Sequence, residues 1–174
     1  MERQSHGFDY QTDIIIKESL NADPFYTGKW DAYNATFSLP VSVKCIGYKN
    51  SIDFGDFIRQ TQVDTDFILY LGLWRGQKNN IIQEYKIIIN KDVWLSYFGD
   101  TSITKMMIDE MKNISNDRSD DGKWKEFRNK YKKLYGDSIV SLRFKRDHKK
   151  QKRIQCGINM TNFLNLVVGQ SIAI

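Results

Sequence analysis

The stretch that decides the fold is residues 28–47, GKWDAYNATFSLPVSVKCIG, in which two short segments alternate apolar and polar residues. Such alternation, with β-branched and aromatic side chains, is typical of half-buried strands. Ser38 and Pro40 lie between the two segments, where a turn is favoured. The sequence therefore predicts two consecutive strands, paired antiparallel.

The segments on both sides of this stretch predict further helices, turns and strands. Residues 8–20 and 51–62 place apolar residues at helical spacing, and residues 21–29 contain the turn signals Asp-Pro and Thr-Gly. Residues 66–75, DFILYLGLWR, form a nearly continuous apolar run of strand length, which is typical of a buried central strand. Another strand is predicted over residues 81–89.

The C-terminal half predicts helices followed by a hairpin. Helices are expected over 91–98, 102–113 and 121–135, strands over 138–146 and 153–159, and an apolar tail over 161–169 that packs back on the body. The element order predicts an α/β (α+β) fold with a mixed central β-sheet flanked by helices, a C-terminal helix and a basic β-hairpin. We expect a single domain over 1–174, with a catalytic core over 1–100 and a helical, basic part over 101–174.

The charge of the chain is unevenly distributed. Residues 1–120 carry 13 Lys/Arg and 17 Asp/Glu, a net charge of −4, whereas residues 121–174 carry 13 and 4, a net charge of +9. A strongly basic segment favours an anionic polymer, most often nucleic acid, as partner. The sequence contains no apolar run of membrane-spanning length and no secretory signal, so we expect an intracellular protein without a membrane partner.

Two basic elements are candidates for holding nucleic acid. In residues 123–133, KWKEFRNKYKK, the aromatic residues share one helical face with Leu134 and the cations take the other. The hairpin turn 145–153 carries six Lys/Arg and one His, although a solvated loop would have the same composition. The predicted DNA-binding residues are Arg143, Lys145, Arg146, His148, Lys149, Lys150, Lys152 and Arg153.

Asp31 and Lys44 carry the chemistry that the two strands suggest. Asp31 lies in GKWDAY on the first strand, and Lys44 lies in the otherwise apolar VSVKCI of the second. A carboxylate can hold a divalent ion that polarises a phosphate, and a lysine can position the attacking water or stabilise charge. A lysine in an apolar strand requires an anion, which an ion pair with Asp31 would also provide.

With Asp31 and the Ser42-Val43-Lys44 strand, residues 8–90 resemble the PD-(D/E)XK nuclease superfamily, which includes many restriction endonucleases. The family acid two positions before the lysine is replaced by Ser42. In restriction enzymes with this Ser-x-Lys variant, an acid from the following helix takes its place. The resemblance therefore implies Asp56, or alternatively Asp53, as the second metal ligand.

The resemblance also implies that Glu18, in the first helix, assists the metal or the water. Arg59 and Gln62, on the helix that follows Asp56, and Ser42 are further candidates for DNA contact. Each of these residues also has a purely structural interpretation, such as Asp53 capping its helix or Glu18 facing solvent.

The sequence therefore predicts a Mg²⁺-dependent endonuclease that hydrolyses double-stranded DNA, resembling a type II restriction enzyme and acting as a homodimer. Loss of the acid at Ser42 supports an alternative, a nucleic-acid-binding protein without activity on a degenerate nuclease scaffold. A third possibility is an interaction protein whose basic patch meets an acidic protein surface.

Overall fold

The alternating stretch forms β3 (Leu39–Gly47) at the centre of a mixed sheet in the computed structural model. The structure describes residues 2–22, 29–76, 80–116, 121–146 and 152–170. β3 pairs antiparallel with β2 (Ala32–Asn34) and parallel with β5 (Phe67–Trp74). The two predicted strands and their antiparallel pairing are therefore confirmed.

Two further strands complete the central sheet of the described residues. β1 (Asn21–Ala22) pairs with β2, and β6 (Ile81–Ile89) pairs antiparallel with β5, so the strand order is β1-β2-β3-β5-β6. β5 is buried from Phe67 to Leu73, as expected for a strand that is covered on both faces. The mixed sheet flanked by helices was predicted correctly.

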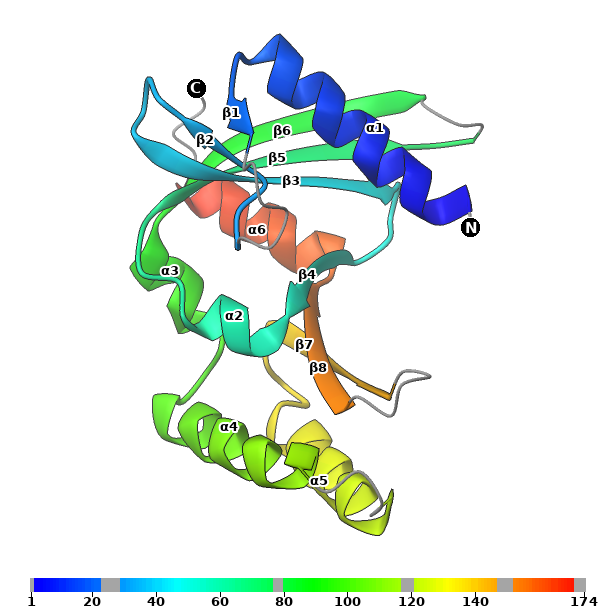
Figure 1. Ribbon diagram of the computed structural model, residues 1–174, viewed down its shortest axis with the longest axis vertical. Coiled ribbons are helices and arrows are strands. Elements are labelled where there is room, and N and C mark those ends of the chain that lie inside the picture. The colour runs from blue at the N-terminus through cyan, green and yellow to red at the C-terminus, as the bar shows by residue number, and fades with distance from the viewer. Residues whose placement is uncertain (1, 23–28, 77–79, 117–120, 147–151, 171–174) are drawn as a thin grey trace. The chain divides into compact units, whose positions relative to one another are not determined.

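A helix covers each face of this sheet (Figure 1). On one face, Tyr10 and Ile14 of α1 (Glu2–Lys17) pack with Val41, Val43 and Tyr70 in an apolar cluster. On the other face, Phe163 of α6 (Met160–Gln170) contacts the Tyr85 ring, with ring centroids 6.4 Å apart. The apolar tail thus packs back on the sheet as predicted.

A second, three-stranded sheet has the order β4-β8-β7. Its strands are β4 (Ile52–Asp56), β7 (Val140–Arg146) and β8 (Lys152–Ile158), and its helices are α2 (Phe57–Thr61), α3 (Lys91–Ser96), α4 (Thr101–Asn116) and α5 (Asp121–Leu134). β7 and β8 form the predicted antiparallel hairpin. Its inner side packs on α5, where Phe144 contacts Trp124 and Phe127.

The chain forms two compact units that interleave along the sequence. The first contains residues 1–52, 64–91 and 160–174, and the second contains residues 53–63 and 92–159. The central sheet belongs to the first unit, and the basic hairpin belongs to the second. No helix of the described residues is both long and apolar enough to cross a membrane.

Two local predictions were wrong. Residues 51–62 do not form one helix, because β4 occupies Ile52–Asp56 and α2 only Phe57–Thr61. The apolar residues of β4 are buried with a period of two, and Gly55 takes a φ of +79° that interrupts helical geometry. On α5, Leu134 is 47% exposed, whereas Tyr135 completes the buried stripe at 7%. Tyr135 follows Trp124 by eleven residues, close to three helical turns, and therefore lies on the same side.

Candidate functional site

Asp31 is fixed against β3 where the short strand β2 begins. Its backbone N–H donates to the Val41 carbonyl at 2.9 Å, and its carboxylate Oδ2 accepts the Val43 N–H at 2.7 Å. On β3, β2 pairs with Leu39, Pro40 and Val41, so the Asp31 carboxylate takes the next position along that edge of β3. The hydrogen bond from a backbone donor to a charged acceptor is strong, and it holds the carboxylate in place.

Ser42 and Lys44 lie on the face of β3 that α6 covers. In the register of the sheet, Lys44 is opposite Leu71, and Leu71 is opposite Tyr85, which contacts α6. Directly paired residues share a face, and residues two apart on a strand do as well. The Ser42 hydroxyl lies 3.5 Å from Asp31 Oδ2. The structure thus brings Asp31 next to Ser42, and Lys44 lies two residues further along the same face of β3.

Lys44 is partly buried, and no hydrogen bond or ion pair joins its ammonium group to the described part of the chain. The ion pair with Asp31 that would have explained this lysine structurally is absent among the described residues. A cation held on a sheet face without a counter-ion has a cost in desolvation. It is therefore suited to receive an anion from outside the chain.

Lys29 and Trp30 precede Asp31 and were not singled out by the sequence. The Lys29 ammonium lies 5.5 Å from the centre of the Trp30 ring, which itself packs on Phe67. Burial lowers the Lys29 pKa, and the Asp64 carboxylate opposes this shift. A second cation thus lies two residues before Asp31 in the sequence. The aromatic residue Trp30 between them, just before the predicted strand, was the one feature of the sequence that could have drawn attention to Lys29.

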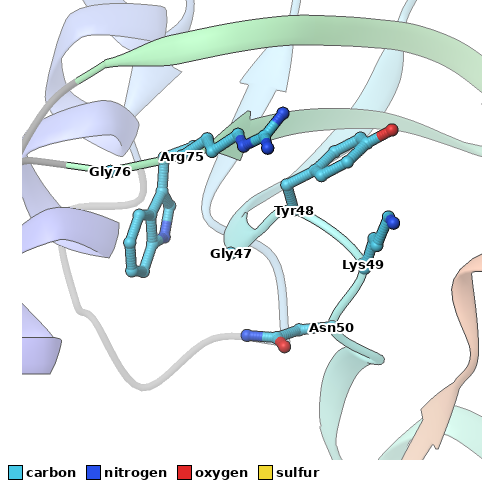
Figure 2. A pocket seen from close by; sticks show the side chains of 7 residues that line it. Gly47, Tyr48, Lys49, Asn50, Arg75 and Gly76 are labelled. Atoms are coloured by element: carbon cyan, nitrogen blue, oxygen red, sulfur yellow. The ribbon is translucent and has the colours of Figure 1, made fainter.

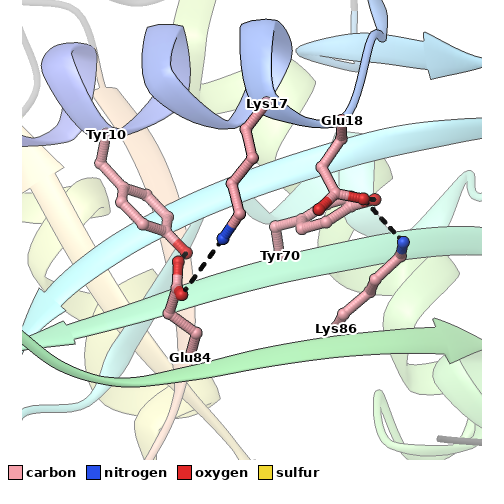
Figure 3. Close-up of polar contacts among 6 residues, drawn as sticks. All are labelled: Tyr10, Lys17, Glu18, Tyr70, Glu84 and Lys86. Carbon is pink, nitrogen blue, oxygen red and sulfur yellow. Dashed lines mark hydrogen bonds and ion pairs between the residues drawn. The ribbon is translucent and has the colours of Figure 1, made fainter. Parts of the chain in front are cut away.

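Glu18 lies on the other face of the sheet (Figure 3). Its carboxylate accepts hydrogen bonds from Lys86 Nζ at 2.7 Å and from the Tyr70 hydroxyl at 3.1 Å. Tyr70 and Lys86 are paired in register with Val43, which packs under α1, so Glu18 and Lys44 are on opposite faces. The structure does not bring Glu18 to Asp31 and Lys44.

The charges around Glu18 satisfy one another. The Lys86 hydrogen bond lowers the Glu18 pKa against the opposing effect of burial. Burial lowers the Lys86 pKa, but hydrogen bonds to Glu18 and Tyr70 outweigh it, so the net shift is upward. Tyr10 donates to Glu84 at 3.1 Å in the same layer, and Lys17 pairs with Glu84 at 3.6 Å. This network is a structural contact between α1 and the sheet.

Asp53 and Asp56 belong to the second unit, and both carboxylates have local partners there. Asp53 accepts the Gly55 N–H at 2.8 Å and forms an ion pair with Arg143 at 2.8 Å. Asp56, rather than Asp53, caps α2 by accepting the Arg59 N–H at 2.9 Å. Neither acid lies on the following helix, as the resemblance implied, since Asp53 lies on β4 and Asp56 precedes α2.

The remaining predicted DNA contacts divide into three groups. Arg59, Gln62, Arg143, Lys145 and Arg153 are exposed residues of the second unit. Lys152 is only 5% exposed, because it lies on the hairpin face that packs inward with Ile154 and Cys156. Arg146 ends β7, and His148, Lys149 and Lys150 lie outside the described residues. The exposed cationic surface of the hairpin therefore contains Arg143, Lys145 and Arg153.

The donors at this sheet edge fit a weakly held Mg²⁺. Mg²⁺ is commonly bound through one or two carboxylates, with water and substrate phosphate completing its coordination. Asp31 Oδ1 accepts no hydrogen bond within the described residues, and the Ser42 hydroxyl is a further oxygen close by. Among all the residues that the structure describes, no three histidine, cysteine, aspartate or glutamate side chains form a group that could hold a metal ion.

No protein-family model, curated protein or solved structure matches this chain. The interpretation of the site therefore depends on the geometry of its own residues.

Proposed function

We propose that this protein is a Mg²⁺-dependent endonuclease that hydrolyses phosphodiester bonds in double-stranded DNA, of the restriction type. The observation that carries the proposal is the ammonium group of Lys44, which has no partner among the described residues. Lys44 shares a strand face with Ser42, whose hydroxyl lies beside the anchored carboxylate of Asp31. The helix α1, the antiparallel pair β2–β3 and the sheet flanked by helices also agree with the resemblance to PD-(D/E)XK nucleases.

Each residue at the edge has a role that follows from its position. Asp31 presents Oδ1 to the cation while Oδ2 remains bonded to the Val43 N–H. Bound Mg²⁺ supplies Lewis-acid polarisation of the phosphate and lowers the pKa of a coordinated water. Lys44 donates hydrogen bonds to a phosphate oxygen or to the attacking water, where charge develops in the transition state. Ser42 orients the Asp31 carboxylate from the same strand face.

The resemblance implies Asp56 or Asp53 as a second acid, but both carboxylates already have partners within the second unit. Asp56 accepts the Arg59 N–H, and Asp53 accepts the Gly55 N–H and pairs with Arg143. Two such protomers would cut both strands of a palindromic site, so we also propose a homodimer on DNA. Its mass in solution is measurable by light scattering, with and without duplex.

The test is incubation of the full chain with plasmid DNA in Mg²⁺ or in EDTA. The wild type is expected to give discrete fragments only with Mg²⁺, and Asp31→Asn and Lys44→Met are expected to give none. Asp109→Asn is the matched control, because it removes a carboxylate that is 60% exposed on α4. Cleavage that persists in Lys44→Met would contradict the site.

A second candidate is a DNA-binding protein without catalysis. It is favoured by the local bonds of Asp53 and Asp56 and by the absence of a three-ligand metal group in the described residues. In that case the plasmid would be retarded on a gel but would stay uncut in Mg²⁺. Substituting Ser42→Glu would then add the acid that the nuclease pattern requires next to Asp31, and Mg²⁺-dependent cleavage would appear only in that variant.

A further inference from the structure

An open pocket of about 460 Å³ lies at the carboxyl ends of the parallel strands β3 and β5. It is lined by Gly47, Tyr48, Lys49, Asn50, Trp74, Arg75 and Gly76, all of which belong to the first unit (Figure 2). Its volume is in the usual range for small-molecule sites. In open sheets, the carboxyl ends of parallel strands are the edge where ligands commonly bind.

The lining combines two cations with an exposed aromatic ring. The Lys49 ammonium and the Arg75 guanidinium each lie 5.7 Å from the centre of the Tyr48 ring, which is 40% exposed. Figure 2 shows the Arg75 side chain extending toward Tyr48. No carboxylate is among the described residues that line the pocket, and Lys49 and Arg75 give this lining a net positive charge. Two neighbouring cations repel each other, and an anion relieves this repulsion.

The backbone that presents these side chains is tightly constrained. The Asn50 N–H donates to the Gly47 carbonyl at 2.9 Å, and Lys49 has a φ of +70° at the third position of this turn. Glycine or asparagine is usual there, because a Cβ is disfavoured at positive φ. A Cβ at Gly47 would lie 2.7 Å from Asn50 Nδ2, so only glycine leaves the amide where it is. Strained positions of this kind cluster at functional sites.

We propose that this pocket binds a nucleotide of an unpaired nucleic-acid strand. The base stacks on the Tyr48 ring, and the phosphate is held by Lys49 and Arg75. A planar aromatic surface beside cations is the combination that single-strand-binding proteins use. The Asn50 amide lines the same pocket and offers both a donor and an acceptor to the edge of a base. An acidic peptide would satisfy the cations but would leave the aromatic surface unused.

The inference rests on the proposed function for its choice of nucleic acid over other anions. It requires no cleavage, and the pocket contains none of the residues assigned to the metal edge. Binding is therefore measured in EDTA, and Asp31→Asn, which is expected to abolish cleavage, is expected to bind the probe as the wild type does. Loss of cleavage and loss of this pocket are thereby separable results.

The probe is a fluorescently labelled, 5′-phosphorylated oligothymidylate, and its anisotropy is measured with the full chain. Tyr48→Ala and Arg75→Gln are each expected to weaken binding about tenfold, because stacking and a charged phosphate contact are both lost. Tyr48→Phe keeps the ring and is expected to stay within about twofold of the wild type. Lys17→Gln removes one cation from α1, where its side chain is 63% exposed, and is the charge-matched control.

The variant Lys49→Asn separates the effect of the Lys49 charge on binding from the effect of the backbone conformation at this position. Asparagine tolerates a positive φ, so the turn is preserved while the ammonium group is lost. We expect weaker binding with an unchanged or higher melting temperature. This variant keeps the proposal testable where a larger substitution would disturb the fold.

Competition decides which chemistry is recognised. Thymidine monophosphate is expected to displace the probe at lower concentration than inorganic phosphate does, and a duplex of equal length is expected to compete less well than a single strand. The proposal is overturned if phosphate alone competes as well as the mononucleotide. It is also overturned if polyglutamate competes equally, or if Tyr48→Ala and Arg75→Gln bind no more weakly than Lys17→Gln.

Discussion

Lys44 illustrates how a single residue can oppose stability and still be required for chemistry. The residue is partly buried on a sheet face, and among the described residues its ammonium group has no counter-ion. The aliphatic part of the side chain can pack on the sheet, but the protein supplies no charge to offset any hydration that the ammonium group loses there. We interpret this as a group held ready for a phosphate.

Replacing Lys44 should therefore stabilise the fold while it removes activity. For Lys44→Met we expect the free energy of unfolding to rise by about 1 kcal/mol, because the apolar stem is kept and the unpaired charge is removed. Urea denaturation measures the change, and Lys17→Met, which removes an exposed ion pair at a side chain that is 63% exposed, should not raise the free energy of unfolding. A loss of stability in Lys44→Met would show that the ammonium group has a structural partner.

Glu18, which directly follows α1, makes the opposite case, because its charge has partners on β5 and β6. Lys86 lowers the Glu18 pKa from its ordinary value of 4.5. A carboxyl whose pKa is depressed on folding stabilises the fold above its unfolded pKa, and this contribution is lost as the pH falls through the folded pKa.

Glu18→Gln is expected to cost about 1–2 kcal/mol of unfolding free energy at neutral pH, because a charge-assisted hydrogen bond becomes a neutral one. The difference from the wild type should shrink as the pH falls below 4.5. Urea denaturation across this pH range tests the prediction. Asp109→Asn, in an ion pair whose side chains are 69% and 60% exposed, should show almost no difference at any pH.

Among the elements, the contact between α1 and β5 is set by a glycine. A Cβ at Gly72 would lie 2.6 Å from the Tyr10 ring, which is 6% exposed, so any side chain there pushes the helix away from the sheet. Gly7, in the same helix as Tyr10, has open space around its Cα.

The two glycines therefore predict opposite effects of the same substitution. Gly72→Ala should destabilise the protein by about 2 kcal/mol through overpacking. Gly7→Ala should stabilise it by up to about 1 kcal/mol, because alanine is the better helix former. Thermal unfolding followed by circular dichroism measures both. Equal melting temperatures for Gly72→Ala and the wild type would show that α1 is not packed closely on β5.

Secondary-structure prediction succeeded where the apolar residues repeat with a single period, and it failed where their spacing suits both a helix and a strand. The apolar run of β5 and the alternation of β3 have one interpretation each. Residues 51–62 satisfy helical spacing and strand alternation together, and Gly55, with its positive φ, marks where the strand turns into α2. That Asp31 lies against β3 followed from the prediction of two adjacent strands. The face of the sheet on which Glu18 lies could not be predicted from the sequence, because it depends on how α1 is rotated about its axis. The packing of Tyr10 and Ile14 on the sheet determines that rotation.

For the whole molecule, the charge is divided less sharply between the two units than it is along the sequence, but the second unit still carries all of the net charge. The second unit has 17 Lys/Arg and 12 Asp/Glu, a net charge of +5, whereas the first has nine of each. The proposed chemistry thus lies in a neutral unit and the proposed grip on DNA lies in a basic one. Electrostatic attraction to a polyanion would act mainly on the second unit.

The contribution of the second unit to DNA binding can be measured on the β7–β8 hairpin. Lys145 and Arg153 are exposed and directly opposite each other across β7 and β8, an arrangement of like charges that destabilises a strand pair. If each of these two cations neutralises one phosphate, the double variant Lys145→Gln/Arg153→Gln lowers the steepness of log affinity against log salt by about 2, while the free energy of unfolding stays equal or rises.

Duplex binding measured in EDTA between about 50 and 200 mM salt gives the slope. Lys112→Gln, on α4 with a side chain 69% exposed, is the matched control. An unchanged slope in the double variant would show that these two cations do not contact the DNA.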